Sequence, residues 1–160
     1  MCGNMFVTSN ETTLLDVNVP MYAAGGDHPS KEACTWVMGE IVEGRLAVAI
    51  NTEIIQEVLY RYGALQRWDI AIGIASDLLN IIPTIYSVVE ADARLAVDLF
   101  KQYSAQGIKS RDLFHVAVMQ NNGLATIIST DTHFDHIPGI TRLDPQTLFQ
   151  QAQRRNTIIR

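Results

Sequence analysis

The chain has 160 residues, of which 48% are hydrophobic and 18% are charged, and its formal net charge is −5. This length fits one domain, and the composition excludes a chain that is disordered over most of its length. The negative charge argues against a protein that holds nucleic acid by broad neutralisation of phosphates.

Location follows from what the chain lacks. No apolar stretch reaches the roughly 18 residues that cross a bilayer, and the N-terminus has neither a basic start nor a long apolar run. Cys2 and Cys34 form no C-x-x-C pair and no disulfide framework, which fits a reducing compartment and gives no zinc signature. We therefore expect a cytoplasmic protein without membrane contact.

Short apolar runs recur along the chain and are typical of buried strands. They cover 14–15, 46–50, 81–89 and 124–129. Because these runs are nearly continuous and rich in aliphatic and β-branched residues, we expect strands that are covered on both faces. Such strands belong to a parallel sheet.

Helical periods lie between these runs. After a possible cap at Ser30, apolar residues from Cys34 to Ile41 follow the i, i+3, i+4, i+7 spacing of one helix face. Further stripes predict helices over 52–62, 69–82, 95–103 and 110–120, and Gly107 ends the fourth of these five segments. The alternation predicts an α/β fold: a single-domain open parallel sheet flanked by helices on both faces, with its ligand crevice beyond the carboxyl ends of the strands.

Four acidic residues are expected to meet at that edge. Asp16 follows the first strand, Asp131 follows the last long one, and Asp112 begins the helix before it. Glu57 lies beside the apolar face of the second helix, where it can face a pocket or pair with Arg61. Each acid alone has an ordinary interpretation as a cap, a turn former or a solvated charge, so only their joint placement favours a site.

Carboxylates that converge need a positive partner. Two of them repel by about 4 kcal/mol at ~4 Å and an effective dielectric constant of ~20. Oxygen ligands select hard ions such as Mg²⁺ or Mn²⁺, which commonly serve the chemistry of phosphate esters. The sequence therefore predicts hydrolysis of phosphodiesters.

Four segments resemble, in order, the successive motifs of PIN-domain proteins, particularly VapC-type toxins. They are 12–23 (T-T-L-L-D-V-N-V-P-M-Y-A), 52–62 (T-E-I-I-Q-E-V-L-Y-R-Y), 109–119 (K-S-R-D-L-F-H-V-A-V-M) and 127–137 (I-I-S-T-D-T-H-F-D-H-I). The resemblance implies a Rossmann-like sandwich and an endoribonuclease that cleaves single-stranded RNA with Mg²⁺ or Mn²⁺. It also implies the catalytic and metal-binding set Asp16, Glu57, Asp112 and Asp131.

The resemblance divides the chain into a non-catalytic N-terminal extension at 1–11, a nuclease domain at 12–145 and a C-terminal helix or tail at 146–160. Thr130 matches a hydroxyl residue frequent in the family that could order water or the scissile phosphate, and Asn18 and Asp135 are further supporting candidates. His115 is expected to be an ordinary half-buried histidine. His133 and His136 are expected to be surface residues.

Partners follow from the same resemblance and from charge. The resemblance implies a small antitoxin, whose basic or amphipathic segment would complement the charge of the acidic residues, and a homodimer formed through helices. A basic rim for RNA is expected from Arg61, Arg67, Lys101, Lys109 and Arg111, and stacking on bases is open to Tyr60, Tyr62 and Trp68, although core packing is favoured for each. The competing function classes are an inactive RNA- or protein-binding module and a phosphatase built on Asp16.

Overall fold

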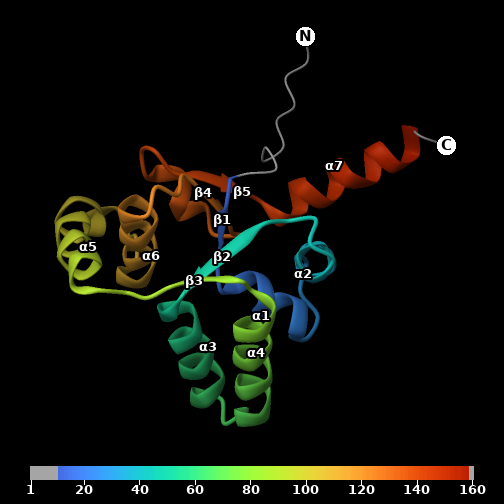
Figure 1. Ribbon diagram of the computed structural model, residues 1–160, viewed down its shortest axis with the longest axis horizontal. Helices are drawn as coiled ribbons and strands as arrows, with labels where there is room; N and C mark the ends of the chain where they lie inside the picture. The colour runs from blue at the N-terminus through green and yellow to red at the C-terminus, as the bar shows by residue number, and fades with distance from the viewer. Residues whose placement is uncertain (1–10, 159–160) are drawn as a thin grey trace.

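The computed structural model describes residues 11–158, and its centre is one sheet of five parallel strands (Figure 1). Their spatial order is β3 (Thr84–Tyr86), β2 (Val48–Asn51), β1 (Thr13–Leu15), β4 (Thr126–Ile128) and β5 (Thr141–Leu143). In the register of the sheet, Leu14 of β1 pairs with Ala49 on one side and Ile127 on the other. Of the predicted extension at 1–11 only Glu11 belongs to the described residues, and Cys2 lies outside them.

Helices connect the strands and cover the sheet. They are α1 (Asn18–Ala24), α2 (Lys31–Val42), α3 (Thr52–Ala64), α4 (Trp68–Ile81), α5 (Glu90–Tyr103), α6 (Ser110–Asn121) and α7 (Pro145–Ile158), with short 3₁₀ helices η1 (Ser104–Gln106) and η2 (Thr132–His136). In Figure 1, α5 and α6 lie together at one side of the sheet, and the α3–α4 hairpin extends away from it. Among residues 11–158, no helix has both the length and the apolar character needed to cross a membrane.

Two apolar cores form because successive strand residues point to opposite faces of a sheet. Leu14 and Ile127 pack on one face with α5, α6 and η2. Leu15 and Ile128 pack on the other face with α1, α2, α3 and α4. The predicted parallel sheet with helices on both faces is confirmed.

The predicted strand at 81–89 is wrong in its extent. Ile81 ends α4, and only 84–86 forms a strand, whose three residues are half-buried. Pro83 disfavours a helical conformation at Ile82, which adopts a ψ of 117° and ends the helix. The strand is short and incompletely covered because β3 lies at the edge of the sheet.

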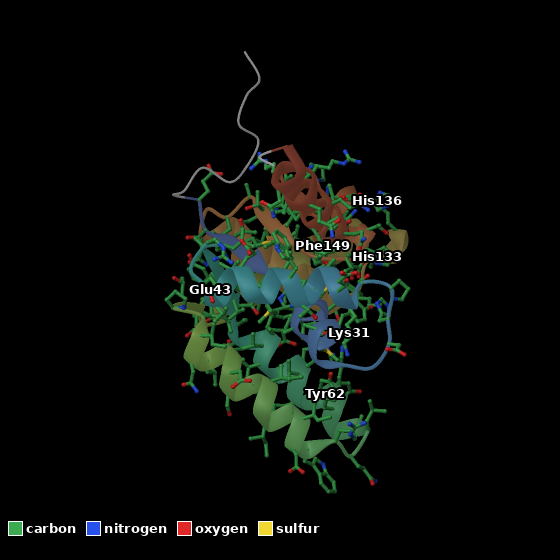
Figure 2. The ribbon with its side chains drawn as sticks, turned by 90° about the vertical axis from the view of Figure 1, so that its right-hand side faces the viewer. Lys31, Glu43, Tyr62, His133, His136 and Phe149 are labelled. Atoms are coloured by element: carbon green, nitrogen blue, oxygen red, sulfur yellow. The ribbon has the colours of Figure 1, made fainter. Side chains whose placement is uncertain are left out.

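Two elements of the fold were not expected from the sequence, and the C-terminal segment, expected as a helix or tail, is a helix. The short helix α1 and the edge strand β5 were not predicted, since each is too short to show a clear apolar period. The C-terminal segment forms α7, which packs on α2 through Trp36 and Phe149, with ring centroids 5.8 Å apart (Figure 2). Gly107, the predicted helix terminator, adopts a left-handed φ of 80° directly after η1.

Candidate active site

The carboxyl edge of the sheet carries a cleft at the place where the strand order reverses. From β1 the chain adds β2 and β3 on one side and later places β4 on the other, and ligands of open α/β sheets bind at such a switch point. Asp16 follows β1 directly, and Asp131 lies three residues beyond β4. Together with Glu57 from α3 and Asp112 from the first turn of α6, they line one cleft of about 370 Å³.

Asp16 is held rigidly at the base of this cleft and is only 4% exposed. Its carboxylate accepts hydrogen bonds from the Val17 backbone N–H (2.7 Å), the Asn18 side-chain amide (2.8 Å) and the Ser129 hydroxyl (2.6 Å). Burial raises the pKa of Asp16 above its ordinary value, although His115, when protonated, and the hydrogen bond from Ser129 oppose the shift. The carboxylate is therefore fixed in orientation but costly to ionise without a cation.

Ser129 is the hydroxyl residue that joins two of the four acids. Its oxygen donates to Asp16 and accepts the backbone N–H of Asp131 at 2.9 Å. The neighbouring Thr130 contributes its backbone N–H to the Asn18 side-chain oxygen at 3.4 Å, and it is not among the residues that line the cleft. The expected role of Thr130 stays a prediction, whereas Ser129 is a residue that the sequence analysis missed.

Glu57 lies beside a buried chain of polar groups that starts at the N-terminus of α3 and ends at His115. The Asn51 side-chain oxygen accepts the Ile54 backbone N–H at 3.2 Å and so caps the helix. The amide nitrogen of Asn51 is thereby left to donate to His115 Nδ1, 3.0 Å away. Nδ1 accepts this bond when the ring is neutral, and Nε2, which has no hydrogen-bond partner among the described residues, lies 3.6 Å from Glu57 Oε2.

His115 is completely buried, so the expectation of a half-buried residue was wrong. Burial acts to lower the pKa of His115, but the facing Glu57, Asp16 and Asp112 outweigh it and raise that pKa. Burial likewise acts to raise the pKa of Glu57, and His115 and Arg61 outweigh it, so the pKa lies below its usual value. Glu57 also forms the predicted ion pair with Arg61 one helical turn later.

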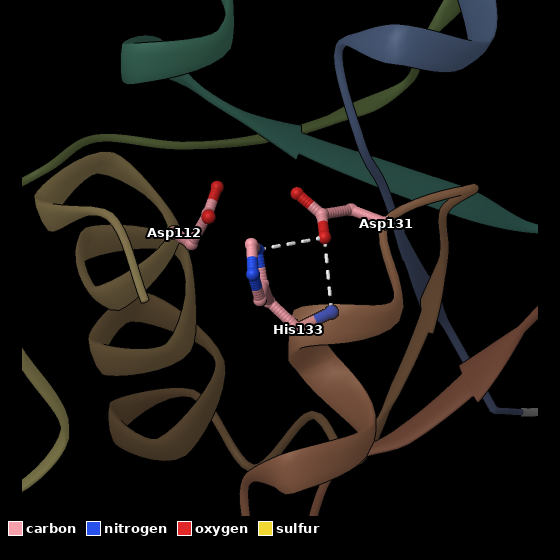
Figure 3. A group of neighbouring side chains, drawn as sticks. All are labelled: Asp112, Asp131 and His133. Atoms are coloured by element: carbon pink, nitrogen blue, oxygen red, sulfur yellow. Dashed lines mark hydrogen bonds and ion pairs between the residues drawn. The ribbon is translucent and has the colours of Figure 1, made fainter. Parts of the chain in front are cut away.

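Asp112 and Asp131 face each other across the cleft together with His133 (Figure 3). One ligand atom from each of the three lies within 4.8 Å of the others. Asp131 Oδ1 accepts the His133 backbone N–H at 2.9 Å and lies 3.0 Å from His133 Nδ1. His133 was expected to be a surface residue, but η2 begins directly after Asp131 and turns the half-buried ring back toward it.

Asp112 shows that the cleft suits a cation. Burial and the charges of Asp16 and Asp131 raise the pKa of Asp112 to about 6. Its Oδ2 is buried and has no hydrogen-bond partner in the described part of the chain, which is costly for a polar atom. A divalent ion would supply both the missing partner and the missing positive charge.

Asp135 and His136 lie apart from this group. Asp135 is exposed and accepts two hydrogen bonds from Arg142, at 2.9 and 3.0 Å, and this guanidinium lowers the pKa of Asp135. His136 is exposed, as expected. The choice of Asp131 over Asp135 therefore agrees with the geometry, because only Asp131 lines the cleft.

The rim of the cleft is basic, as expected, but it contains fewer of the basic residues than predicted. Its lining includes Arg61, Lys109 and Arg111, whereas Arg67 and Lys101 are not part of it. Lys101 instead pairs with Asp98 at 3.1 Å on the surface of α5.

The three aromatic residues considered for stacking on bases lie in different environments. Tyr62 belongs to the core, as favoured, and is 9% exposed. Trp68 is 63% exposed and lies outside the cleft lining, so core packing was wrong for it. Core packing was also wrong for Tyr60, which lines the cleft.

Comparison with known proteins decides the family. The PIN domain pattern matches residues 13–140. Ribonuclease VapC13 of Mycobacterium tuberculosis is 32% identical over 131 residues, which are 81% of this chain and 98% of that protein. The chain is a member of the PIN-domain family.

Solved structures described as a toxin and as a toxin–antitoxin complex share its fold. The chain superposes with a TM-score of 0.66 on Mycobacterium tuberculosis VapC20, described as a toxin that cleaves the sarcin–ricin loop, at 12% identity over 78% of this chain and 93% of that one. A toxin–antitoxin complex from Klebsiella pneumoniae gives a TM-score of 0.59 at 19% identity, over 84% of this chain and 98% of that one. At these identities the likeness supports the fold.

Proposed function

We propose that this PIN-domain protein is a metal-dependent endoribonuclease that cleaves single-stranded RNA and acts as the toxin of a toxin–antitoxin pair. The observation that carries the proposal is the meeting of Asp16, Glu57, Asp112 and Asp131 in one cleft with a basic rim. The curated relative at 32% identity is named a ribonuclease, and the pairing covers almost its full length.

The four carboxylates are the proposed ligands of Mg²⁺ or Mn²⁺. They offer oxygen atoms only, as hard ions prefer, and the unpartnered Asp112 Oδ2 and the raised pKa values of Asp16 and Asp112 fit a bound cation. When bound, such an ion supplies Lewis-acid chemistry that favours attack of water on phosphorus and stabilises charge on the departing oxygen.

The chain itself contributes orientation and charge. Three hydrogen bonds fix Asp16, the ion pair with Arg61 restrains Glu57, and His115 and Arg61 favour the ionised form of Glu57. Without an ion the four acids repel a phosphate. Arg61, Lys109 and Arg111 at the rim can therefore hold the RNA backbone on either side of the acidic centre.

Incubation with labelled single-stranded RNA tests the proposed activity. Cleavage is expected in Mg²⁺ or Mn²⁺ and not in EDTA, and it should return when excess ion is restored. Cleavage that continues in EDTA would contradict the metal-dependent mechanism. Absence of cleavage for every single-stranded substrate in both ions would favour an inactive binding module instead.

An antitoxin and a second copy of the chain are the proposed protein partners. One structure that shares the fold is itself a toxin–antitoxin complex, and the acidic cleft would suit a basic segment of such a partner. The α3–α4 hairpin exposes Leu65, Trp68 and Ile72, which supports association of two copies through helices.

Light scattering should give twice the monomer mass, and a monomer at working concentration would contradict the homodimer. The proposed location is the cytoplasm.

A further inference from the structure

Tyr60 combines exposure with a fixed position at the mouth of the cleft. It follows Glu57 by three residues on α3, so both side chains lie on the same side of the helix. Tyr60 is 58% exposed although it is aromatic, and it lines the cleft. The ring therefore lies next to the acidic centre and in contact with solvent.

Arg111 holds the ring from the other side of the cleft. Its guanidinium carbon lies 4.5 Å from the Tyr60 ring centroid, and its Nη1 lies 3.7 Å from Glu57 Oε1. A guanidinium placed between a carboxylate and an aromatic ring is attracted by both. One face of Tyr60 is thus covered by Arg111, and the exposed part of the ring is free to receive another flat group.

Single-stranded RNA offers the groups that this pair fits. Unpaired bases stack on aromatic side chains, and phosphates bind guanidinium groups, whereas the bases of a duplex are already stacked on each other. The neighbouring Arg61 and Lys109 add positive charge along the same rim. An aromatic ring fixed beside a phosphate-cleaving centre is therefore in position to bind the base of an adjacent nucleotide.

We infer that Tyr60, positioned by Arg111, stacks on an unpaired nucleobase next to the scissile phosphate and selects single-stranded RNA. This inference rests on the proposed ribonuclease function. Another exposed aromatic, Phe100 on α5, lies outside the cleft and provides a matched control.

Steady-state cleavage of a single-stranded RNA by Tyr60→Leu, Tyr60→Phe and Phe100→Leu gives the first test. Loss of one stacked base should raise the KM of Tyr60→Leu roughly tenfold and leave kcat within about twofold. Tyr60→Phe should behave as wild type because the ring is kept, and Phe100→Leu should also be unchanged. An unchanged KM in Tyr60→Leu, or a fall in kcat alone, would overturn the stacking role.

Binding to modified RNA gives the second test and does not need cleavage. In the Asp16→Asn background with Mg²⁺, the affinity is measured for a short RNA and for copies with one abasic position at a time. One abasic position should weaken binding roughly tenfold when Tyr60 is present and leave it nearly unchanged in the Tyr60→Leu background. Equal losses in both backgrounds would overturn the inference. They would instead favour packing of a partner protein's segment on the Tyr60 ring.

The two tests separate the failure of this inference from the failure of the proposed function. If the wild-type protein cleaves RNA but Tyr60→Leu changes neither KM nor the abasic effect, only the stacking role is lost. If the wild-type protein cleaves no RNA and binds it with no abasic effect, the proposed function and the inference fall together.

Discussion

Replacement of Asp131 or Asp16 by asparagine should reduce RNA cleavage at least ~100-fold, since each change removes a proposed carboxylate ligand and its charge. The backbone of η2 should persist in Asp131→Asn, because an asparagine oxygen can still accept the His133 N–H that Asp131 accepts now. The measurement is the initial rate of cleavage at saturating Mg²⁺, together with the circular dichroism spectrum of each variant.

Asp135→Asn is the matched control for this prediction. Asp135 lies on the same short helix as His133 but binds Arg142 outside the cleft, so its replacement should leave the cleavage rate within about twofold. Equal loss of activity in Asp131→Asn and Asp135→Asn would contradict the assignment of Asp131. A fully active Asp16→Asn would contradict the proposed centre.

Asp112→Asn should make the metal-free protein more stable at neutral pH while it abolishes stabilisation by metal. A carboxylate whose pKa is raised in the folded state binds its proton more tightly there than in the unfolded chain. Its ionisation therefore costs stability progressively as the pH rises from its ordinary value of 3.8 to about 6, and the cost remains at pH 7. Removal of the charge should regain about 1 kcal/mol or more, seen as a Tm about 2–4 °C higher.

Thermal unfolding in EDTA and in Mn²⁺ measures both halves of this effect. Wild-type protein should gain stability from Mn²⁺ at pH 7.5 and gain less at pH 5.5, where protons compete for Asp112. Asp77→Asn, at an exposed position of α4 outside the cleft, serves as the control and should respond to Mn²⁺ as wild type does. A lower Tm for Asp112→Asn in EDTA would show that the cluster is not strained by its charge.

The sequence predicts the sheet and the helices of this molecule because both depend on the spacing of buried apolar residues along the chain. The alternation of apolar runs and helical stripes was sufficient for the parallel sheet with two covered faces, and the chain positions of Asp16 and Asp131 just after strands placed both at one edge. The edge strands were harder to predict: β3 was predicted too long and β5 was not predicted, since both bury too few residues to show a clear strand period.

The details of the site could not be predicted because they depend on contacts between elements distant in the chain. His115 reads as an ordinary helix position until the fold brings Asn51 and Glu57 to its two ring nitrogens. Ser129 and Thr130 are adjacent hydroxyl residues, and only the geometry at the end of β4 shows which one reaches Asp16. The catalytic and metal-binding roles of the four acids remain predictions.

The strand order also bears on the synthesis of the protein. Asp16 and Asp131 follow the neighbouring strands β1 and β4 but are separated by most of the domain in the chain, with Glu57 and Asp112 between them. No nascent chain that stops before β4 can carry the full set of acids, even if its first three strands have already paired. The proposed catalytic centre can thus be complete only when almost the whole domain has been synthesised.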